Sequence, residues 1–184
     1  MPVYISMLRG VNVGGHNKIK MEELRALCAS LGLSGAQTHI QSGNVVFKAK
    51  GTDSVQLAKR IGDAIERKFG FRSPVLLRTT SELRQAVTRN PFADRKGIDP
   101  SKLLVTFLST EPQALARERL LNLKIEPEEL HLIGRELYVY FPNGIARPKF
   151  SWSSVERILQ VSGTGRNWNT VNKLLEMAEQ FEIA

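Results

Sequence analysis

The sequence contains one cysteine, Cys28, and three histidines in 184 residues. One cysteine cannot form an internal disulfide, and the widely spaced histidines match no zinc-ligand pattern, so we expect no metal site. No apolar run approaches the roughly 18 residues that cross a bilayer. The first residues also lack the basic segment, apolar run and cleavage site of a secretory signal. We therefore expect a cytoplasmic protein with no membrane partner.

Acidic residues are scarce relative to basic ones: 18 Asp and Glu stand against 26 Lys and Arg, which gives a net charge of +8. The composition, 42% hydrophobic and 24% charged, is that of a globular protein. Residues 1–21 contain three basic and no acidic residues, residues 141–173 are also basic, and residues 111–130 are acidic. A basic surface favours anionic partners, including nucleic acid, although the same charge is compatible with a basic surface that has no specific partner.

Apolar spacing in the first half predicts the order strand, helix, strand, strand, helix, strand. The strands are expected over Val3–Leu8, Gln37–Gln41, Asn44–Lys48 and Val75–Arg78, and the helices over Met21–Leu31 and Leu57–Phe69. This is the order of a ferredoxin-like βαββαβ unit. A connecting helix over Ser81–Val87 and a loop over Asn90–Gly97 follow, so we place the first subdomain at residues 1–90.

The second half, residues 91–184, begins in the same way and predicts a related α+β subdomain. Its elements are expected to be a strand over Leu103–Leu108, a helix over Pro112–Leu121, a hairpin over Glu129–Ile133 and Leu137–Phe141, and helices over Ser153–Gln160 and Asn169–Phe181. A helix thus stands where the first half has its last strand. We interpret this as a degenerate internal duplication.

The segment Leu8–Lys18 joins the first strand to the first helix and is rich in glycine and asparagine. Glycine main chain, a following helix N-terminus and nearby basic side chains suit a phosphate group. The candidate ligand-binding residues here are Arg9, Asn12, Gly14, Gly15 and Lys18. The spacing matches no established nucleotide-binding motif, and the glycines are equally compatible with a tight turn. His16, in the same loop, is interpreted as a solvated side chain.

Two further segments combine polar residues with turn signals. Ser42 and Asn44 lie at the turn of the first hairpin and are candidate ligand contacts, although small polar residues suit any tight turn. Gly163–Thr170 precedes the last helix, where Thr164 or Asn167 can cap the helix. Arg166 and Trp168 could hold an anion or stack on a base, or Trp168 could pack in a core while Arg166 pairs with a carboxylate.

None of the three segments contains Asp or Glu. A general acid or base would have to come from a histidine, a lysine or a carboxylate elsewhere in the chain. We therefore assign no catalytic residue and no cofactor, and the sequence leaves open whether the protein is an enzyme.

Four motifs in order resemble the bacterial family named domain of unknown function 1697. They stand at Leu8–Gly15, Lys18–Leu24, Ile40–Phe47 and Thr164–Thr170. Gly165 departs from the pattern, because the family usually carries threonine or a similar residue before the arginine. The resemblance implies an α+β fold of two subdomains, the first ferredoxin-like, and implies no activity.

Three functional hypotheses follow. In the first, a small anionic or phosphate-bearing ligand binds in a cleft between the subdomains: the basic side chains hold it, the asparagines orient it, and Trp168 stacks on it. The residues in these roles are Arg9, Lys18 and Arg166, with Asn12, Asn44 and Asn167. In the second, the sheet binds nucleic acid, for which only Tyr4 and Phe47 supply strand aromatics. In the third, the motifs join the subdomains through buried polar contacts. The sequence predicts no oligomeric state.

Overall fold

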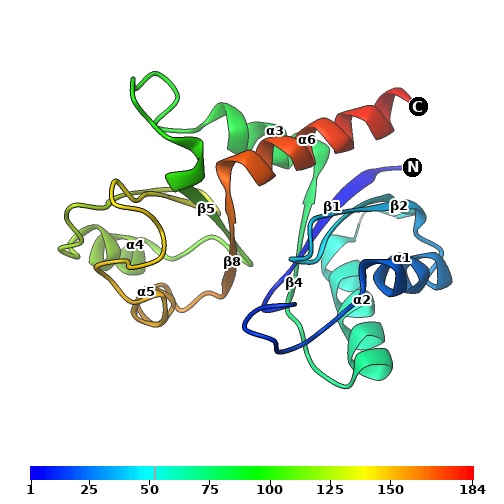
Figure 1. Cartoon of the computed structure of the whole chain (residues 1–184). Coiled ribbons are helices and arrows are strands. Elements are labelled where there is room, and N and C mark those ends of the chain that lie inside the picture. Colours follow the sequence, from blue (N-terminus) through cyan, green and yellow to red (C-terminus); the bar gives the residue numbers. More distant parts are fainter. Residues whose placement is uncertain (52) are drawn as a thin grey trace. The chain divides into compact units, whose positions relative to one another are not determined.

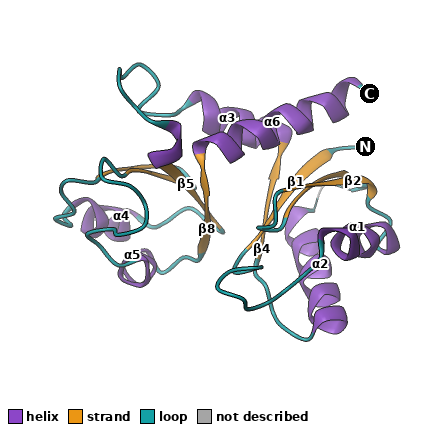
Figure 2. Cartoon of the chain, in the orientation of Figure 1, coloured by secondary structure: helices purple, strands orange, loops and turns teal. Residues whose placement is uncertain are grey.

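The computed structural model describes residues 1–51 and 53–184. These residues form two compact units, one of residues 1–85 together with 173–184 and one of residues 86–172. Each unit contains a four-stranded antiparallel sheet with helices (Figure 2), so the predicted α+β class is confirmed. Within the described residues, every helix is too short or too polar to cross a membrane.

The first unit has the ferredoxin-like order that apolar spacing predicts. It comprises β1 (Val3–Leu8), α1 (Met21–Ser30), β2 (Ser34–His39), β3 (Asn44–Lys48), α2 (Ser54–Phe69) and β4 (Val75–Thr79). The strand order is β2-β3-β1-β4, and every neighbouring pair is antiparallel. Figure 1 shows α1 and α2 on the same face of this sheet. The second strand begins and ends earlier than predicted.

Alternate strand residues and one face of each helix form the core of the first unit. Tyr4 and Phe47 point toward the helices with their rings 6.1 Å apart, and Ile61 of α2 packs in the same cluster. Helix α2 is capped at both ends: the Asp53 side chain accepts hydrogen bonds from two main-chain N–H groups of the first turn, and Gly70 ends the helix at a φ of 80°.

Helix α6 (Trp168–Ile183) begins in the second unit and ends in the first. In the first unit its last turns lie beside α3 (Thr80–Thr88) (Figure 1). Arg84 donates hydrogen bonds to Glu179 at 2.9 Å and to Glu182 at 3.2 Å. The apolar face of the last helix was predicted, but the hydrogen bonds from Arg84 of α3 to this helix were not.

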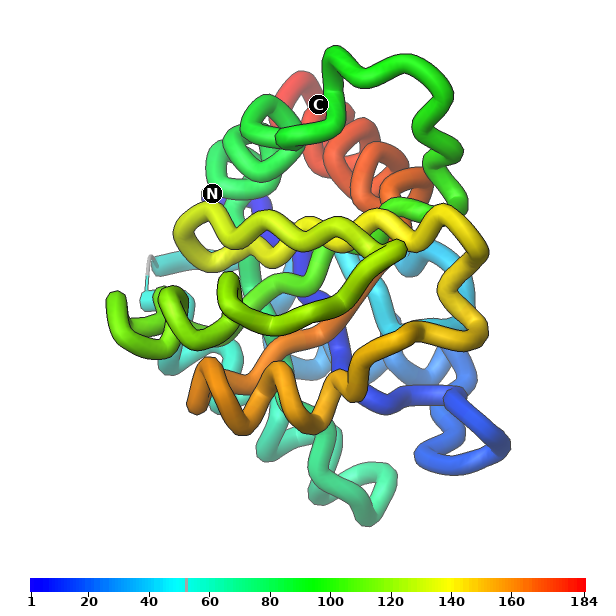
Figure 3. The backbone as a smooth tube through the Cα atoms, turned by 90° about the vertical axis from the view of Figure 1, so that its left-hand side faces the viewer, coloured from blue at the N-terminus to red at the C-terminus, as the bar shows by residue number. Residues whose placement is uncertain are grey.

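The second unit repeats the first in full. After a short 3-10 helix at Pro100–Lys102 it comprises β5 (Leu103–Leu108), α4 (Ala114–Leu121), β6 (Glu129–Ile133), β7 (Glu136–Tyr140), α5 (Trp152–Leu159) and β8 (Gly163–Asn167). The strand order β6-β7-β5-β8 matches the first sheet position for position. Figure 3 shows the β6–β7 hairpin as two yellow strands side by side.

The prediction that a helix replaces the last strand of the second half was wrong. Residues Gly163–Asn167 contain a single typical strand former, Thr164, but they pair with β5 along their whole length, from Leu108↔Gly163 to Leu104↔Asn167. Main-chain hydrogen bonding to the central strand overrides the weak local preference. The duplication is therefore complete in its strands.

Equivalent main-chain hydrogen bonds support the relation between the two units. Each central strand ends with one bond to the hairpin turn and one to the residue before the last strand. The four bonds are Leu8 N–H to Gly43 O at 3.1 Å and Arg9 N–H to Pro74 O at 3.0 Å, and Leu108 N–H to Arg135 O and Ser109 N–H to Ser162 O, both at 2.9 Å.

Gly163 is fixed by a close approach to β5. A Cβ atom at this position would lie 2.8 Å from the Phe107 carbonyl oxygen, which the sheet holds in place. A Cβ at Gly165 would meet the movable end of the Leu104 side chain at 3.1 Å. The two glycines of one strand therefore differ in what surrounds them.

We expect Gly163→Ala to lower the free energy of unfolding by about 1–3 kcal/mol, because the main chain must shift to admit the methyl group. Gly165→Ala is the matched control and should cost less, since Leu104 can change its rotamer. Urea denaturation of both variants measures the difference. Equal losses would show that the approach to Phe107 is not the constraint.

Candidate functional site: the glycine loop and its cavity

The loop of residues 9–20 leaves β1 and enters α1 through a series of left-handed backbone conformations. Gly14 and Gly15 have φ angles of 58° and 78°, and Asn12 and Asn17 have φ angles of 56° and 51°. Glycine and asparagine adopt this region most readily. The composition of the loop therefore follows from its main-chain path.

The Asn12 side chain holds the loop closed. Its Nδ2 donates to the Ile19 carbonyl oxygen at 2.9 Å and to the Gln41 carbonyl oxygen at 2.7 Å. Its Oδ1 accepts a hydrogen bond from the Ile19 N–H at 2.9 Å. Both ends of the amide thus bind main chain, and the loop is joined to the β2–β3 turn.

Asn44 has a similar structural role in the β2–β3 hairpin. It is fully buried, and its Nδ2 donates to the His39 carbonyl oxygen at 3.1 Å and to Ser42 Oγ at 2.9 Å. Gly43 completes this turn at a φ of 81°. The turn thus presents the Gln41 side chain, rather than Asn44, at the surface.

A cavity of about 520 Å³ lies between the loop, the start of α1 and the hairpin turn. Its lining residues are Asn12, Gly15, Lys18, Ile19, Lys20, Glu23 and Gln41. Three of these, Asn12, Gly15 and Lys18, are predicted site residues. Gln41 was missed, because only the structure shows that the hairpin turn lies beside the loop. Lys20, at the end of the loop, was counted in the basic charge of the segment but not among the site residues.

The cavity is more basic than acidic. Lys18 and Lys20 contribute two positive charges, and Glu23 contributes one negative charge. Lys20 is also the N-cap of α1, and no side chain caps this helix. The positive end of the helix dipole therefore adds to the two lysines, which favours an anion at the helix start.

The predicted residues of the C-terminal motif lie in the second unit. Arg166 on β8 is 7% exposed and donates to Thr164 Oγ1 and to the Gly165 carbonyl oxygen, both at 2.9 Å. Burial lowers the pKa of the Arg166 guanidinium to about 10.

Asn167 accepts a hydrogen bond from the Thr170 N–H and so caps α6, as predicted for Thr164 or Asn167. Trp168 is half-buried at the start of α6. That these residues form one site together with the glycine loop stays a prediction.

The aromatic and thiol side chains of the first unit belong to its core. Tyr4 and Phe47, the strand aromatics considered for base stacking, are 2% and 0% exposed. Cys28 is buried in α1, and burial raises the pKa of its thiol to about 11. Among the described residues, no group of three or more His, Cys, Asp or Glu side chains could hold a metal ion.

Comparison with known proteins identifies a family and a similar structure. A family model described as "Protein of unknown function (DUF1697)" matches residues 1–138. The structure of conserved bacterial protein SP0830 from Streptococcus pneumoniae is similar, with a TM-score of 0.68 and 22% sequence identity over 97% of this chain and 99% of that chain. This likeness shows the fold. No curated protein matches the sequence.

We expect Asn12→Gly to lower the free energy of unfolding by about 2 kcal/mol. Glycine keeps the left-handed backbone accessible, so the loss reports the missing hydrogen bonds to Ile19 and Gln41. Asn17→Gly is the matched control, because Asn17 also has a positive φ but donates one exposed hydrogen bond, to the Gly10 carbonyl oxygen. Urea denaturation measures both, and an equally small effect at both positions would contradict the role of Asn12.

Proposed function

The chain belongs to the DUF1697 family of proteins of unknown function, and we propose that it binds a small anionic, phosphate-bearing ligand in the cavity beside Gly15 and Lys18. The proposal uses residues of the first unit alone and assigns no reaction. Its single strongest support is that the cavity joins two lysines to a glycine main chain and an uncapped helix start.

The main chain at Gly15 is open to a ligand. A Cβ atom built on Gly15 would meet no atom within 4 Å, so the main chain there has open space on its Cα side, and its exposed peptide suits an anion. Lys18 and Lys20 have exposed side chains that can turn toward such an anion. The exposed amide of Gln41 supplies a further donor from the opposite side of the cavity.

The contacts of the two asparagines limit the proposal. Asn12 and Asn44 hold the loop and the hairpin, so they shape the site and do not serve as its main ligand donors. Glu23 repels an anion and lowers the affinity of the cavity for it, so the direction of the change in affinity can be tested at this residue. Removing a lysine and removing Glu23 must have opposite effects on anion binding.

We expect inorganic pyrophosphate, added at constant ionic strength, to shift the main-chain amide NMR signals of Gly14 and Gly15. Lys18→Met should weaken binding about fivefold, since a charge-assisted hydrogen bond at an exposed site contributes roughly 1 kcal/mol. Glu23→Gln should strengthen binding about twofold, because a like charge is removed.

Lys96→Met is the matched control, since Lys96 is exposed and lies in the second unit. It removes the same charge from the protein and should leave binding unchanged. Equal weakening by Lys96→Met and Lys18→Met would indicate a response to net charge alone. An absence of shifts at Gly14 and Gly15 would also contradict the proposal.

A further inference from the structure

The cavity beside the glycine loop is larger than an inorganic anion requires. Its volume is about 520 Å³, and a single phosphate group would fill only a small part of it. Volumes of this size are typical of pockets that hold small organic molecules. The space beside the anion therefore has room for an organic group, and the chemistry of the cavity wall indicates which kind of group fits.

Most of the exposed surface that lines this cavity is carbon, although most of its residues are polar. Among the described residues that line it, Ile19 is the one apolar side chain, and it is only 2% exposed. The carbon surface must therefore belong mainly to the aliphatic parts of the polar residues. The lining residues with exposed side chains and methylene stems are Lys18, Lys20, Glu23 and Gln41.

A lysine side chain presents two kinds of surface to a ligand. Its methylene stem packs along an apolar group while its ammonium group stays in water or binds an anion. Lys18 and Lys20 bring both kinds of surface to the same cavity. The carbon atoms attached to an anion bound by these ammonium groups are therefore close to the apolar stems of the same side chains.

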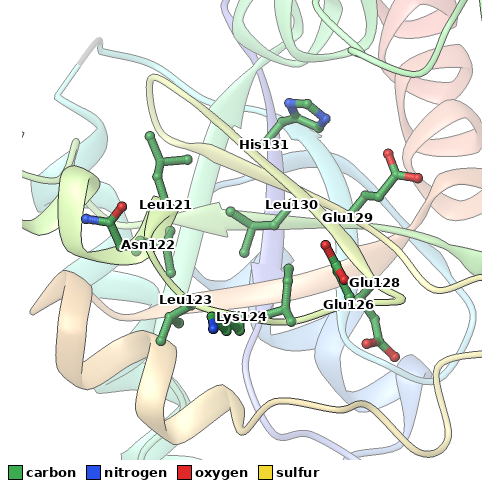
Figure 4. A pocket seen from close by; sticks show the side chains of 11 residues that line it. Leu121, Asn122, Leu123, Lys124, Glu126, Glu128, Glu129, Leu130 and His131 are labelled. Atoms are coloured by element: carbon green, nitrogen blue, oxygen red, sulfur yellow. The ribbon is translucent and has the colours of Figure 1, made fainter.

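A cavity in the second unit has the opposite character. It has a volume of about 680 Å³ and is lined by residues 120–126 and 128–131. Figure 4 shows Glu126, Glu128 and Glu129 together on one side of it, and its lining is more polar than apolar. Three carboxylates near one another repel an anion. Of these two cavities, only the one beside the glycine loop combines a net positive charge with a mainly carbon surface.

A sugar or glycerol group matches this wall poorly. A hydroxyl group that leaves water for a carbon surface, without a hydrogen-bond partner there, costs free energy. Asn12 does not serve as the partner, because both ends of its amide bind main chain. Gln41 has the other amide of the lining, and one amide cannot bond several hydroxyls. An apolar group, in contrast, gains free energy when it leaves water for the same surface.

We propose that the ligand of this cavity is a phosphate monoester with an aromatic or other apolar body, an inference that rests on the proposed function. The phosphate binds at Gly15 and the lysine ammonium groups, and the body packs against the stems of Lys18, Lys20 and Gln41. The ammonium groups select an anion, and the stems select among anions. Inorganic phosphate and sugar phosphates gain only the first of these two contributions.

The first test compares three phosphate monoesters on the full chain: phenyl phosphate, methyl phosphate and glycerol 3-phosphate. At about pH 8 all three are dianions, because the second pKa of a phosphate monoester is about 6. NMR titration at constant ionic strength follows the main-chain amides of Gly15 and Gln41. Phenyl phosphate should bind about fivefold more tightly than the other two esters, since its ring buries apolar surface that they lack.

The outcomes of this test separate the inference from the proposed function. Equal affinities of the three esters, with shifts at Gly15, overturn the inference and leave the anion site intact. Binding of glycerol 3-phosphate as tight as that of phenyl phosphate also overturns the inference. An absence of binding by all three esters overturns both. Tighter binding of phenyl phosphate that shifts neither Gly15 nor Gln41 places the ring elsewhere and overturns the inference.

The second test changes the carbon surface at Gln41, whose side chain is exposed. Gln41→Ser removes the amide and most of the stem, whereas Gln41→Leu removes the amide and keeps the carbon. Loss of the amide affects all phosphate esters alike, so the ratio of the phenyl phosphate affinity to the methyl phosphate affinity reports the carbon surface. This ratio should fall about twofold in Gln41→Ser and be retained in Gln41→Leu. An unchanged ratio in Gln41→Ser, or an equal fall in both variants, overturns the proposal.

Discussion

The two-sided hydrogen bonding of each central strand is the constraint on which the rest of the structure depends. β1 pairs with β3 and β4, and β5 pairs with β7 and β8, so neither strand has a free edge. The pairing continues one residue beyond each strand, at Arg9 and Ser109. The chain must then leave the sheet and reach its helix without disturbing either neighbour. The first unit does so through the glycine loop, which requires left-handed residues, and its candidate site exists because of that detour.

The sequence predicted those elements whose apolar residues are periodic. Helix α2 is the clearest case, since its buried Leu57, Ile61, Ala64 and Ile65 follow the helical repeat and Gly70 ends it. β8 could not be predicted, because Gly163–Asn167 owes its extended form to pairing with β5 and not to its side chains. The docking of the end of α6 in the first unit also could not be predicted. An amphipathic pattern shows that a face is buried, and it does not show against what.

The sequence predicted the position of the glycine loop better than it predicted what each residue of the loop does. The glycine loop was correctly identified as a strand-to-helix connection, and Gly15 and Lys18 line its cavity. The asparagines were assigned to a ligand, but Asn12 and Asn44 bind main chain. A short amide is the side chain best suited to bond neighbouring peptide groups in a left-handed turn, so an asparagine in a glycine-rich loop indicates loop closure as readily as recognition.

The lengths of equivalent connections explain why the two repeats carry different cavities. In the first unit, residues 9–20 join the central strand to its helix, and the shorter segment 109–113 does so in the second. From helix to the next strand the relation is reversed, since residues 31–33 are shorter than residues 122–128. The basic cavity of the first unit lies beside residues 9–20, and an acidic cavity of the second unit, lined by residues 120–126 and 128–131, lies beside residues 122–128. Each cavity thus lies beside the longer connection. A net charge of +8 describes neither cavity, because screening makes the nearby charges, and not the net charge, determine the local potential.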